Sequence, residues 1–251
     1  MSTLLSVLLI LCAGPANLAL SRAMVLRHME GLVARSVVRI ERVTSYRVGP
    51  DINRMINHGT GVVIGEQRVN GHREYLVLSN EHVARNNHVP GESVLHIVNG
   101  DATHESILLE TLAVDSKRDQ ALLRTVGCNE AFTVPEYVIG PPPEDIKRDS
   151  VFTEGYGGGR FAIIEGEILS TEFEDWGLRC YKVGVAVRGG QSGAPLVVIG
   201  ADKKLYLAAL IFCGDEHFTA ATPLYPGKGV LRRITSSVQD LPYWPDRLSR
   251  R

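Results

Sequence analysis

Short runs of alternating apolar and polar residues dominate the chain from residue 36 onward. A period of two is typical of strands with one buried face, and Gly, Asn or Pro bounds most of these runs. Asn70-Gly71 and Asn99-Gly100 each separate two runs, and this dipeptide favours a two-residue hairpin turn. We therefore predict an all-β protein with strands at SVVRIERV, GTGVVIGEQRV, REYLVLS, SVLHIV, ESILLETLAV, DQALLRTV, VFTEGYG, FAIIEGEIL, CYKVGVAV, APLVVIG, LYLAALIF and FTAAT.

Three consecutive prolines in YVIGPPPEDIKRDS interrupt the series of strands. Proline lacks the donor that a central strand needs, so the stretch predicts a linker over residues 137–148. The linker separates two sets of strands of similar size. We predict two β-subdomains, over residues 24–136 and 149–240, followed by a tail over residues 241–251.

One helix is predicted, near the end of the second subdomain. Val230, Ile234 and Val238 recur every four residues after Gly229, which is a helical spacing. Two polar stretches, Arg47 to His58 and Glu144 to Ser150, are expected to be loops. Trp176 and Trp244 are expected to pack against the core.

The N-terminal residues 1–23 have the character of a leader. An apolar core from Leu4 to Ala13 is followed by Ser21-Arg22-Ala23, which fits a small-x-small cleavage site. We expect a signal peptide and a secreted or periplasmic protein. The alternative is an uncleaved membrane anchor over Thr3 to Leu20, and only then would the protein contact a membrane.

Charge and cysteine spacing exclude several classes of function. The 27 basic and 28 acidic residues give a formal net charge of −1, so a nucleic-acid partner is not expected. The four cysteines form no CxxC pair, and no metal site is predicted. Without Cys12, which lies in the leader, Cys128, Cys180 and Cys213 allow at most one disulfide.

The stretch VRGGQSGAPLV places Ser192 directly after a glycine-rich turn. A serine hydroxyl becomes a nucleophile only beside a base, an orienting group and donors for the oxyanion. Gly189 and Gly190 allow the backbone to turn N–H groups toward one point, so the amides of Gly190 and Ser192 are candidate donors.

His82 and Asp119 are the candidate base and orienting carboxylate. His82 follows an apolar strand, Tyr75 to Leu78, so it is expected at a rigid strand end. Asp119 immediately precedes a mainly apolar run that is expected to be buried, whereas Asp115, the alternative carboxylate, lies in a polar turn.

The stretches SNEHV, RDQALL and GQSGAP, in that order, resemble the His, Asp and Ser motifs of the chymotrypsin-like serine peptidases. The chain is most similar to the Deg (HtrA-type) branch, in which a GTG strand precedes the His motif, as Gly59-Thr60-Gly61 does here. In that branch a G-I-V-S-like strand also follows a Gly-rich loop, as GEILS follows GYGGG. Too few residues follow Gln239 for a PDZ module, so none is expected.

The resemblance implies two six-stranded antiparallel β-barrels with a C-terminal helix. It also implies His82 as general base, Asp119 as its partner, Ser192 as nucleophile, and the Gly190 and Ser192 amides as the oxyanion hole. The implied reaction is endopeptidase hydrolysis of a protein or peptide substrate through an acyl-enzyme, without a cofactor.

By the same resemblance, six residues are expected to form the pocket for the substrate side chain before the scissile bond. No acidic residue stands at its base, where Ala186 matches the family's position, so an apolar or small side chain is expected. The six residues are Ala186, Val187, Gly189, Phe212, Gly214 and Ala220.

The chain departs from the family pattern at Gln191, Ala194, Glu81 and Gln120. Ala194 fits if its φ is negative. A carboxylate at Glu81 would compete for the imidazole unless it points outward, as we expect from strand alternation. These departures keep open a catalytically silent barrel that binds peptides or a protein partner. The order His, Asp, Ser excludes an α/β-hydrolase.

Overall fold

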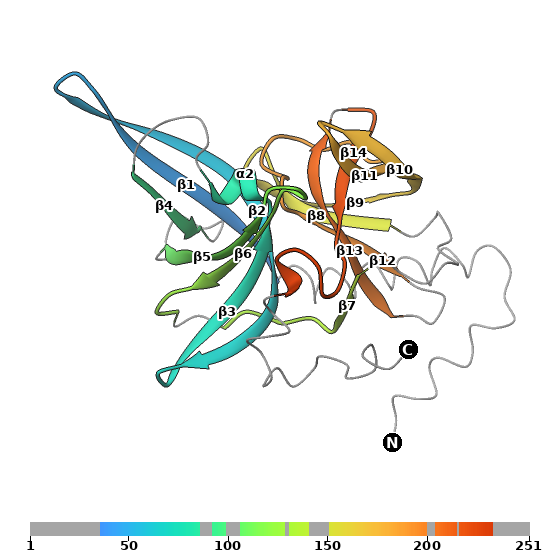
Figure 1. The fold of residues 1–251 in the computed structure, drawn as a ribbon, viewed down its shortest axis with the longest axis horizontal. Helices are drawn as coiled ribbons and strands as arrows, with labels where there is room; N and C mark the ends of the chain where they lie inside the picture. Colours follow the sequence, from blue (N-terminus) through green and yellow to red (C-terminus); the bar gives the residue numbers. More distant parts are fainter. Residues whose placement is uncertain are drawn as a thin grey trace, which may run out of the picture.

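The computed structural model describes residues 36–85, 92–98, 106–128, 131–140, 151–199, 204–214 and 216–232. Strands dominate these residues, which confirms the predicted all-β class. They form two antiparallel sheets in sequence order, so that the two halves of the chain lie next to each other (Figure 1).

The first half is a closed barrel of six antiparallel strands, as predicted. Their order around the barrel is β1-β2-β3-β6-β5-β4. The barrel encloses a cluster of buried apolar side chains, including Ile40, Val77 and Leu123. The strands are β1 (Val37–Val48), β2 (Asp51–Val69), β3 (His72–Ser79), β4 (Glu92–Ile97), β5 (Ile107–Asp115) and β6 (Gln120–Thr125).

The second half forms one eight-stranded sheet instead of the predicted six-stranded barrel. Seven strands follow the order β10-β11-β14-β13-β12-β8-β9, and β7 pairs in parallel with β13. The strands are β7 (Tyr137–Ile139), β8 (Val151–Gly157), β9 (Arg160–Gly166), β10 (Ile168–Asp175), β11 (Leu178–Val183), β12 (Pro195–Ile199), β13 (Leu205–Gly214) and β14 (Thr219–Pro223).

Two local features account for the additional strands. The run FAIIEGEIL, predicted as one strand, divides at Glu167 into β9 and β10, which are the two ends of the sheet order. The Glu167 carbonyl accepts a hydrogen bond from the Gly184 amide, 2.8 Å long, at this division. The start of the predicted linker supplies β7, and residues 141–148 of that linker lie outside the described residues.

An apolar cluster joins the two halves. It combines Val37, Leu76 and Leu122 of the barrel with Phe152 and Leu207 of the second sheet. Fully burying one such side chain contributes roughly 1.5–3 kcal/mol, so the cluster is a substantial part of the free energy that holds the halves together.

Glycine-containing turns close the hairpins. At the predicted Asn70-Gly71 turn both residues have positive φ, +52° and +83°, as a type I′ turn requires, and Val69 pairs with His72. The β10–β11 hairpin has an unpredicted turn of the same kind at Trp176-Gly177. Trp176 is 85% exposed, so its expected packing role is wrong. Asn99-Gly100 lies outside the described residues.

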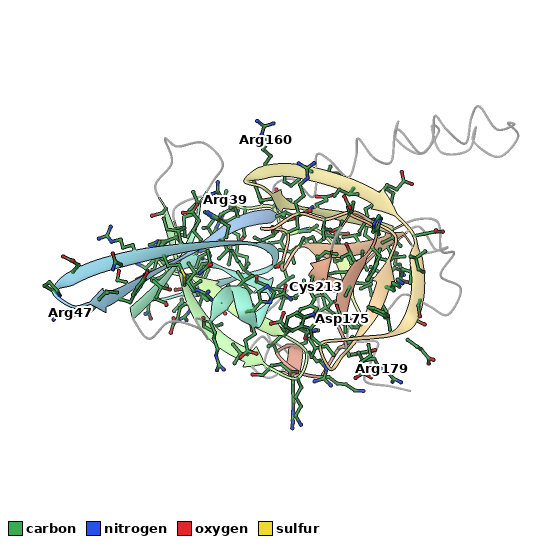
Figure 2. All side chains as sticks on the ribbon, turned by 90° about the horizontal axis from the view of Figure 1, so that it is seen from above. Arg39, Arg47, Arg160, Asp175, Arg179 and Cys213 are labelled. Carbon is green, nitrogen blue, oxygen red and sulfur yellow. The ribbon has the colours of Figure 1, made fainter. Side chains whose placement is uncertain are left out.

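The predicted loop Arg47 to His58 is also wrong, because it belongs to a long hairpin of β1 and β2. The two strands stay paired out to Val48 and Asp51, with Gly49 at φ +63° in the turn. β4 accompanies β1 only as far as Ser45, so residues 46–53 form a two-stranded arm (Figure 1). The arm projects from the barrel with Arg47 near its end, far from the middle of the molecule (Figure 2).

The chain ends are only partly covered. Leu231 and Arg232 are helical, and the rest of the predicted C-terminal helix, the tail, Trp244 and Glu144 to Ser150 lie outside the described residues. The predicted leader over residues 1–23 also lies outside them. No helix within the described ranges is both long and apolar enough to cross a membrane.

Candidate active site

His82 lies on a one-turn helix directly after β3, not at the strand end itself. The helix α2 spans Glu81–Ala84. Two hydrogen bonds hold His82 on Asp119: its amide donates to Oδ1 at 2.9 Å, and its ring Nδ1 lies 2.6 Å from Oδ2. The Asn80 side chain also donates to the Asp119 carbonyl at 2.9 Å. The carboxylate therefore fixes both the backbone and the ring of His82.

Asp119 adopts an unusual backbone conformation in the turn between β5 and β6. Its φ is +49°, in the left-handed region that Asp tolerates better than most residues, and it is only 7% exposed. Asp115, the alternative carboxylate, instead accepts from the Arg118 guanidinium at 2.6 Å and from the Lys117 amide. The structure thus brings Asp119, and not Asp115, to His82.

Ser192 lies across from this pair, in a loop over residues 188–194 that we call the serine loop. Its hydroxyl lies 3.4 Å from the Phe212 carbonyl and makes no hydrogen bond to His82. The Phe212 ring meets the His82 ring edge to face, with 6.0 Å between centroids. Phe212 therefore contacts both candidates, the predicted nucleophile through its carbonyl and the predicted base through its ring.

A β-bulge places Phe212 there. Ile211 pairs with Ala221, but Cys213 pairs with Ala220, so Phe212 is the extra residue in β13. A bulge locally disrupts the ladder and redirects a side chain. Nothing in the sequence around LIFCG had indicated this.

Two hydrogen-bonded carbonyls of the serine loop determine the direction of the Gly190 and Ser192 amides. The Gly189 carbonyl accepts from the Gly158 amide, and the Gln191 carbonyl accepts from the Ala194 amide, each at 2.9 Å. Because a trans peptide is planar, the N–H groups of Gly190 and Ser192 point away from these contacts. Neither amide donates to another described residue. The two predicted oxyanion donors are therefore free to bind a ligand.

Thr60 of β2 anchors the serine loop to the barrel. Its amide donates to the Ser192 carbonyl and its hydroxyl to the Gly190 carbonyl, both at 2.8 Å. The Tyr156 amide in turn donates to that hydroxyl at 3.1 Å. Gly193 lies so close that a Cβ would sit 2.1 Å from the Thr60 carbonyl. The motif Gly59-Thr60-Gly61 thus carries a contact between the two halves.

The departures from the family pattern fit the structure. Gln191 is 2% exposed, and its Oε1 accepts from the Arg188 amide at 2.7 Å, which closes the serine loop on itself. Ala194 does not have positive φ. Gln120 donates from its side chain to the Pro223 carbonyl at 2.8 Å and so links the two halves.

The expectation that Glu81 points outward is wrong. Its side chain is buried on α2, where Oε1 accepts from Arg85 at 2.9 Å and from the Ser116 hydroxyl at 2.8 Å. Strand alternation does not apply to a helical turn, which explains the error. These partners hold Glu81 away from the imidazole, which keeps its contact with Asp119.

The predicted pocket residues lie in two groups. A Cβ on Gly214 would be 2.6 Å from a methyl group of Val187, so these residues adjoin Phe212 on β13. Ala220 is buried on β14 opposite Cys213. Ala186 is exposed just before the serine loop, and Gly189 is exposed within it.

Next to Phe212 along β13, the thiol of Cys213 meets a carboxylate. Cys213 donates to the Asp175 carboxylate at 2.9 Å, and the two residues lie together in Figure 2. Burial, followed by the hydrogen bond to Asp175, raises the pKa of the Cys213 thiol to about 12. Cys128, Cys180 and Cys213 are all free thiols. No group of His, Cys, Asp and Glu within the described ranges is arranged to hold a metal ion.

Comparison with known proteins supports the fold and the family. Residues 59–202 match a family model described as a trypsin-like peptidase domain. A solved structure of an HtrA-type protease, AlgW, with a tripeptide matches with a TM-score of 0.55 and 18% identity. The match covers 78% of this chain and 59% of that chain. No curated protein matches the sequence.

Replacing Thr60 by Val tests the anchor between the halves. The substitution keeps the shape but leaves the Gly190 carbonyl and the Tyr156 amide without their partner, so the free energy of unfolding should fall by about 2 kcal/mol. Thr153→Val is the matched control, because the buried Thr153 hydroxyl has no partner within the described residues. Urea unfolding would contradict the assignment if both variants lost the same stability.

Replacing Asp175 by Asn tests the environment of Cys213. Removing the negative charge should lower the pKa of the Cys213 thiol, and each unit of decrease raises the thiolate fraction about tenfold. Alkylation of Cys213 by iodoacetamide at pH 8.5, followed by peptide mass spectrometry, should be slow in the wild type and faster in the variant. Cys180, which is fully buried, should stay protected in both. Equal Cys213 rates in the two proteins would contradict this.

Proposed function

Because the chain belongs to the trypsin-like peptidase domain family, we propose that it is a serine endopeptidase acting through an acyl-enzyme. The observation that carries the proposal is the double hydrogen bond by which Asp119 holds the amide and the ring of His82. A buried carboxylate on Nδ1 keeps the proton on that nitrogen, so Nε2 remains available as an acceptor.

In the proposed mechanism Ser192 attacks the carbonyl carbon of the scissile peptide. His82 accepts the hydroxyl proton on Nε2 and then donates it to the leaving amine. Asp119 stabilises the imidazolium that forms in between. A water molecule repeats the sequence on the acyl-enzyme, which releases the second product and restores Ser192.

The first step requires rotation of the Ser192 side chain. Its hydroxyl faces the Phe212 carbonyl at 3.4 Å, which is a long and therefore weak contact. Rotation about the Cα–Cβ bond moves the oxygen off the carbonyl without moving the backbone. Catalytic hydrogen bonds are often loose without substrate and tighten in the complex.

The amides of Gly190 and Ser192 are the proposed oxyanion hole. Their direction follows from the hydrogen-bonded carbonyls of Gly189 and Gln191. Donors that are already oriented stabilise the tetrahedral intermediate without reorganisation, and one such donor is typically worth about 3 kcal/mol.

The proposed substrate is an extended peptide bound along β13. One side of β13 pairs with β14, and the other side pairs with β12 as far as Leu210. The last backbone bond on the β12 side runs from the Ile211 amide to the Ala194 carbonyl. Phe212 to Gly214 have no strand partner on that side within the described residues. A peptide can add there as a strand, with a small or apolar side chain entering beside Val187 and Gly214. The tripeptide in the structure of the HtrA-type protease supports a peptide ligand.

A silent peptide-binding barrel is the second candidate. The orientation of the Ser192 hydroxyl toward Phe212 instead of His82 favours it. The apolar run within residues 1–23, if it is a leader, supports a secreted or periplasmic setting, or a membrane-anchored one if it is retained.

Labelling with a fluorophosphonate probe tests the proposal. This reagent modifies a serine that a base has activated, so we expect the full chain to be labelled on Ser192 and Ser192→Ala to remain unlabelled. Asp119→Asn should slow labelling by on the order of 10⁴-fold, because the amide no longer fixes the imidazole tautomer.

Asp115→Asn is the matched control for Asp119→Asn. Asp115 lies in the same turn but contacts Arg118 and Lys117, so this variant should label at the wild-type rate. A folded wild-type protein that takes up no label on Ser192 would overturn the peptidase and favour the silent barrel.

A further inference from the structure

Arg42 is a buried cation whose partners, among the residues that the structure describes, all lie on the segment that carries His82. It points inward from β1 and is 4% exposed. Its Nη1 donates to the carbonyls of His82 at 2.9 Å, Val83 at 3.2 Å and Arg85. Burial lowers the pKa of the Arg42 guanidinium, and none of the described carboxylates pairs with it.

These three carbonyls belong to the C-terminal end of α2. A helix leaves its last carbonyls without intrahelical partners, and in α2 only Asn80 and Glu81 accept from within the turn, from Ala84 and Arg85. A single turn is not stable on its own. The Arg42 guanidinium supplies the missing donors, and its positive charge also suits the negative end of a helix.

A second contact holds α2 from the same side. A Cβ on Gly59 would lie 2.5 Å from a methyl group of Val83, so Val83 packs directly onto the β2 backbone. Asp119, in the turn before β6, holds the amide of His82. The position of the His82 ring is therefore set by three contacts. Of these three, only the contact with Arg42 donates hydrogen bonds to the carbonyls at the C-terminal end of α2.

We propose that Arg42 is a positioning residue for His82: by fixing the backbone of α2 it holds the imidazole where Ser192 can reach it. This inference rests on the proposed peptidase function. Arg42 touches neither the reacting atoms nor the β13 edge. Its loss should therefore lower the rate of the chemical step and leave ligand binding unchanged.

The test is the saturation kinetics of Ser192 labelling by the fluorophosphonate probe in the full chain. For Arg42→Met, which keeps an unbranched apolar stem but removes every donor, the maximal rate kinact should fall about 10- to 100-fold. The half-saturating concentration KI should stay within about threefold of the wild type. Arg42→Lys keeps a cationic donor in a different geometry and should recover part of the rate, remaining about three- to tenfold below the wild type.

Arg124→Met is the matched control. Arg124 lies in the same barrel and pairs with Glu110 and Glu74. It makes no hydrogen bond or ion pair to α2 within the described residues, so its kinact should stay at the wild-type value. Near-ultraviolet circular dichroism and the thermal midpoint show that each variant is folded. A folded Arg42→Met with wild-type kinact would overturn the proposal.

Two further outcomes are decisive. If Arg42→Met does not fold, Arg42→Lys carries the test, and a wild-type kinact in that variant would assign Arg42 to folding alone and overturn the proposal. If the wild type itself takes up no label, the peptidase function fails, which is a different result from labelling that is insensitive to Arg42.

Discussion

The hydrogen bonds of Thr60 are the constraint on which the candidate site depends. His82 and Asp119 belong to the barrel, whereas Ser192 and Phe212 belong to the second sheet. The proposed chemistry therefore requires that the two halves keep a fixed register. Thr60 fixes this register next to the candidate nucleophile, because its amide and hydroxyl donate to the carbonyls of Ser192 and Gly190. The bond from Gln120 to Pro223 and the shared apolar cluster reinforce the same contact farther away.

Hydrogen bonds to backbone carbonyls orient the groups around the Thr60 contact. The carbonyls of Gly189 and Gln191 determine where the Gly190 and Ser192 amides point, and those of His82 and Val83 receive Arg42. Unusual backbone conformations accompany these contacts, with φ of +98° at Gly190 and +85° at Gly193. Glycine adopts such angles without a steric penalty, so the serine loop can be tight without strain.

Local chemistry made part of the site predictable from the sequence. The stretches around His82, Asp119 and Ser192 each combine a candidate side chain with a strand or turn signal. The structure brings Asp119 to His82, and Phe212 contacts both His82 and Ser192. The Asn70-Gly71 turn was predictable for the same reason, because the dipeptide itself favours the required φ.

Features that depend on distant contacts were not predictable. A one-turn helix is too short to show periodicity, so α2 was missed, and with it the burial of Glu81. The partners of Arg42 are about forty residues away along the chain, and a polar residue on a strand ordinarily indicates a solvated face. The bulge at Phe212 and the division at Glu167 depend on the register between strands, which no local pattern determines.

We propose above all that Ser192, His82 and Asp119 cleave an extended peptide where the serine loop meets the barrel. The most direct test is incubation of the full chain with an unfolded protein such as reduced, alkylated casein, with the new N-termini identified by mass spectrometry. We expect cleavage after small or apolar residues by the wild type and none by Ser192→Ala. No cleavage by the folded wild type, or equal cleavage by both proteins, would contradict it.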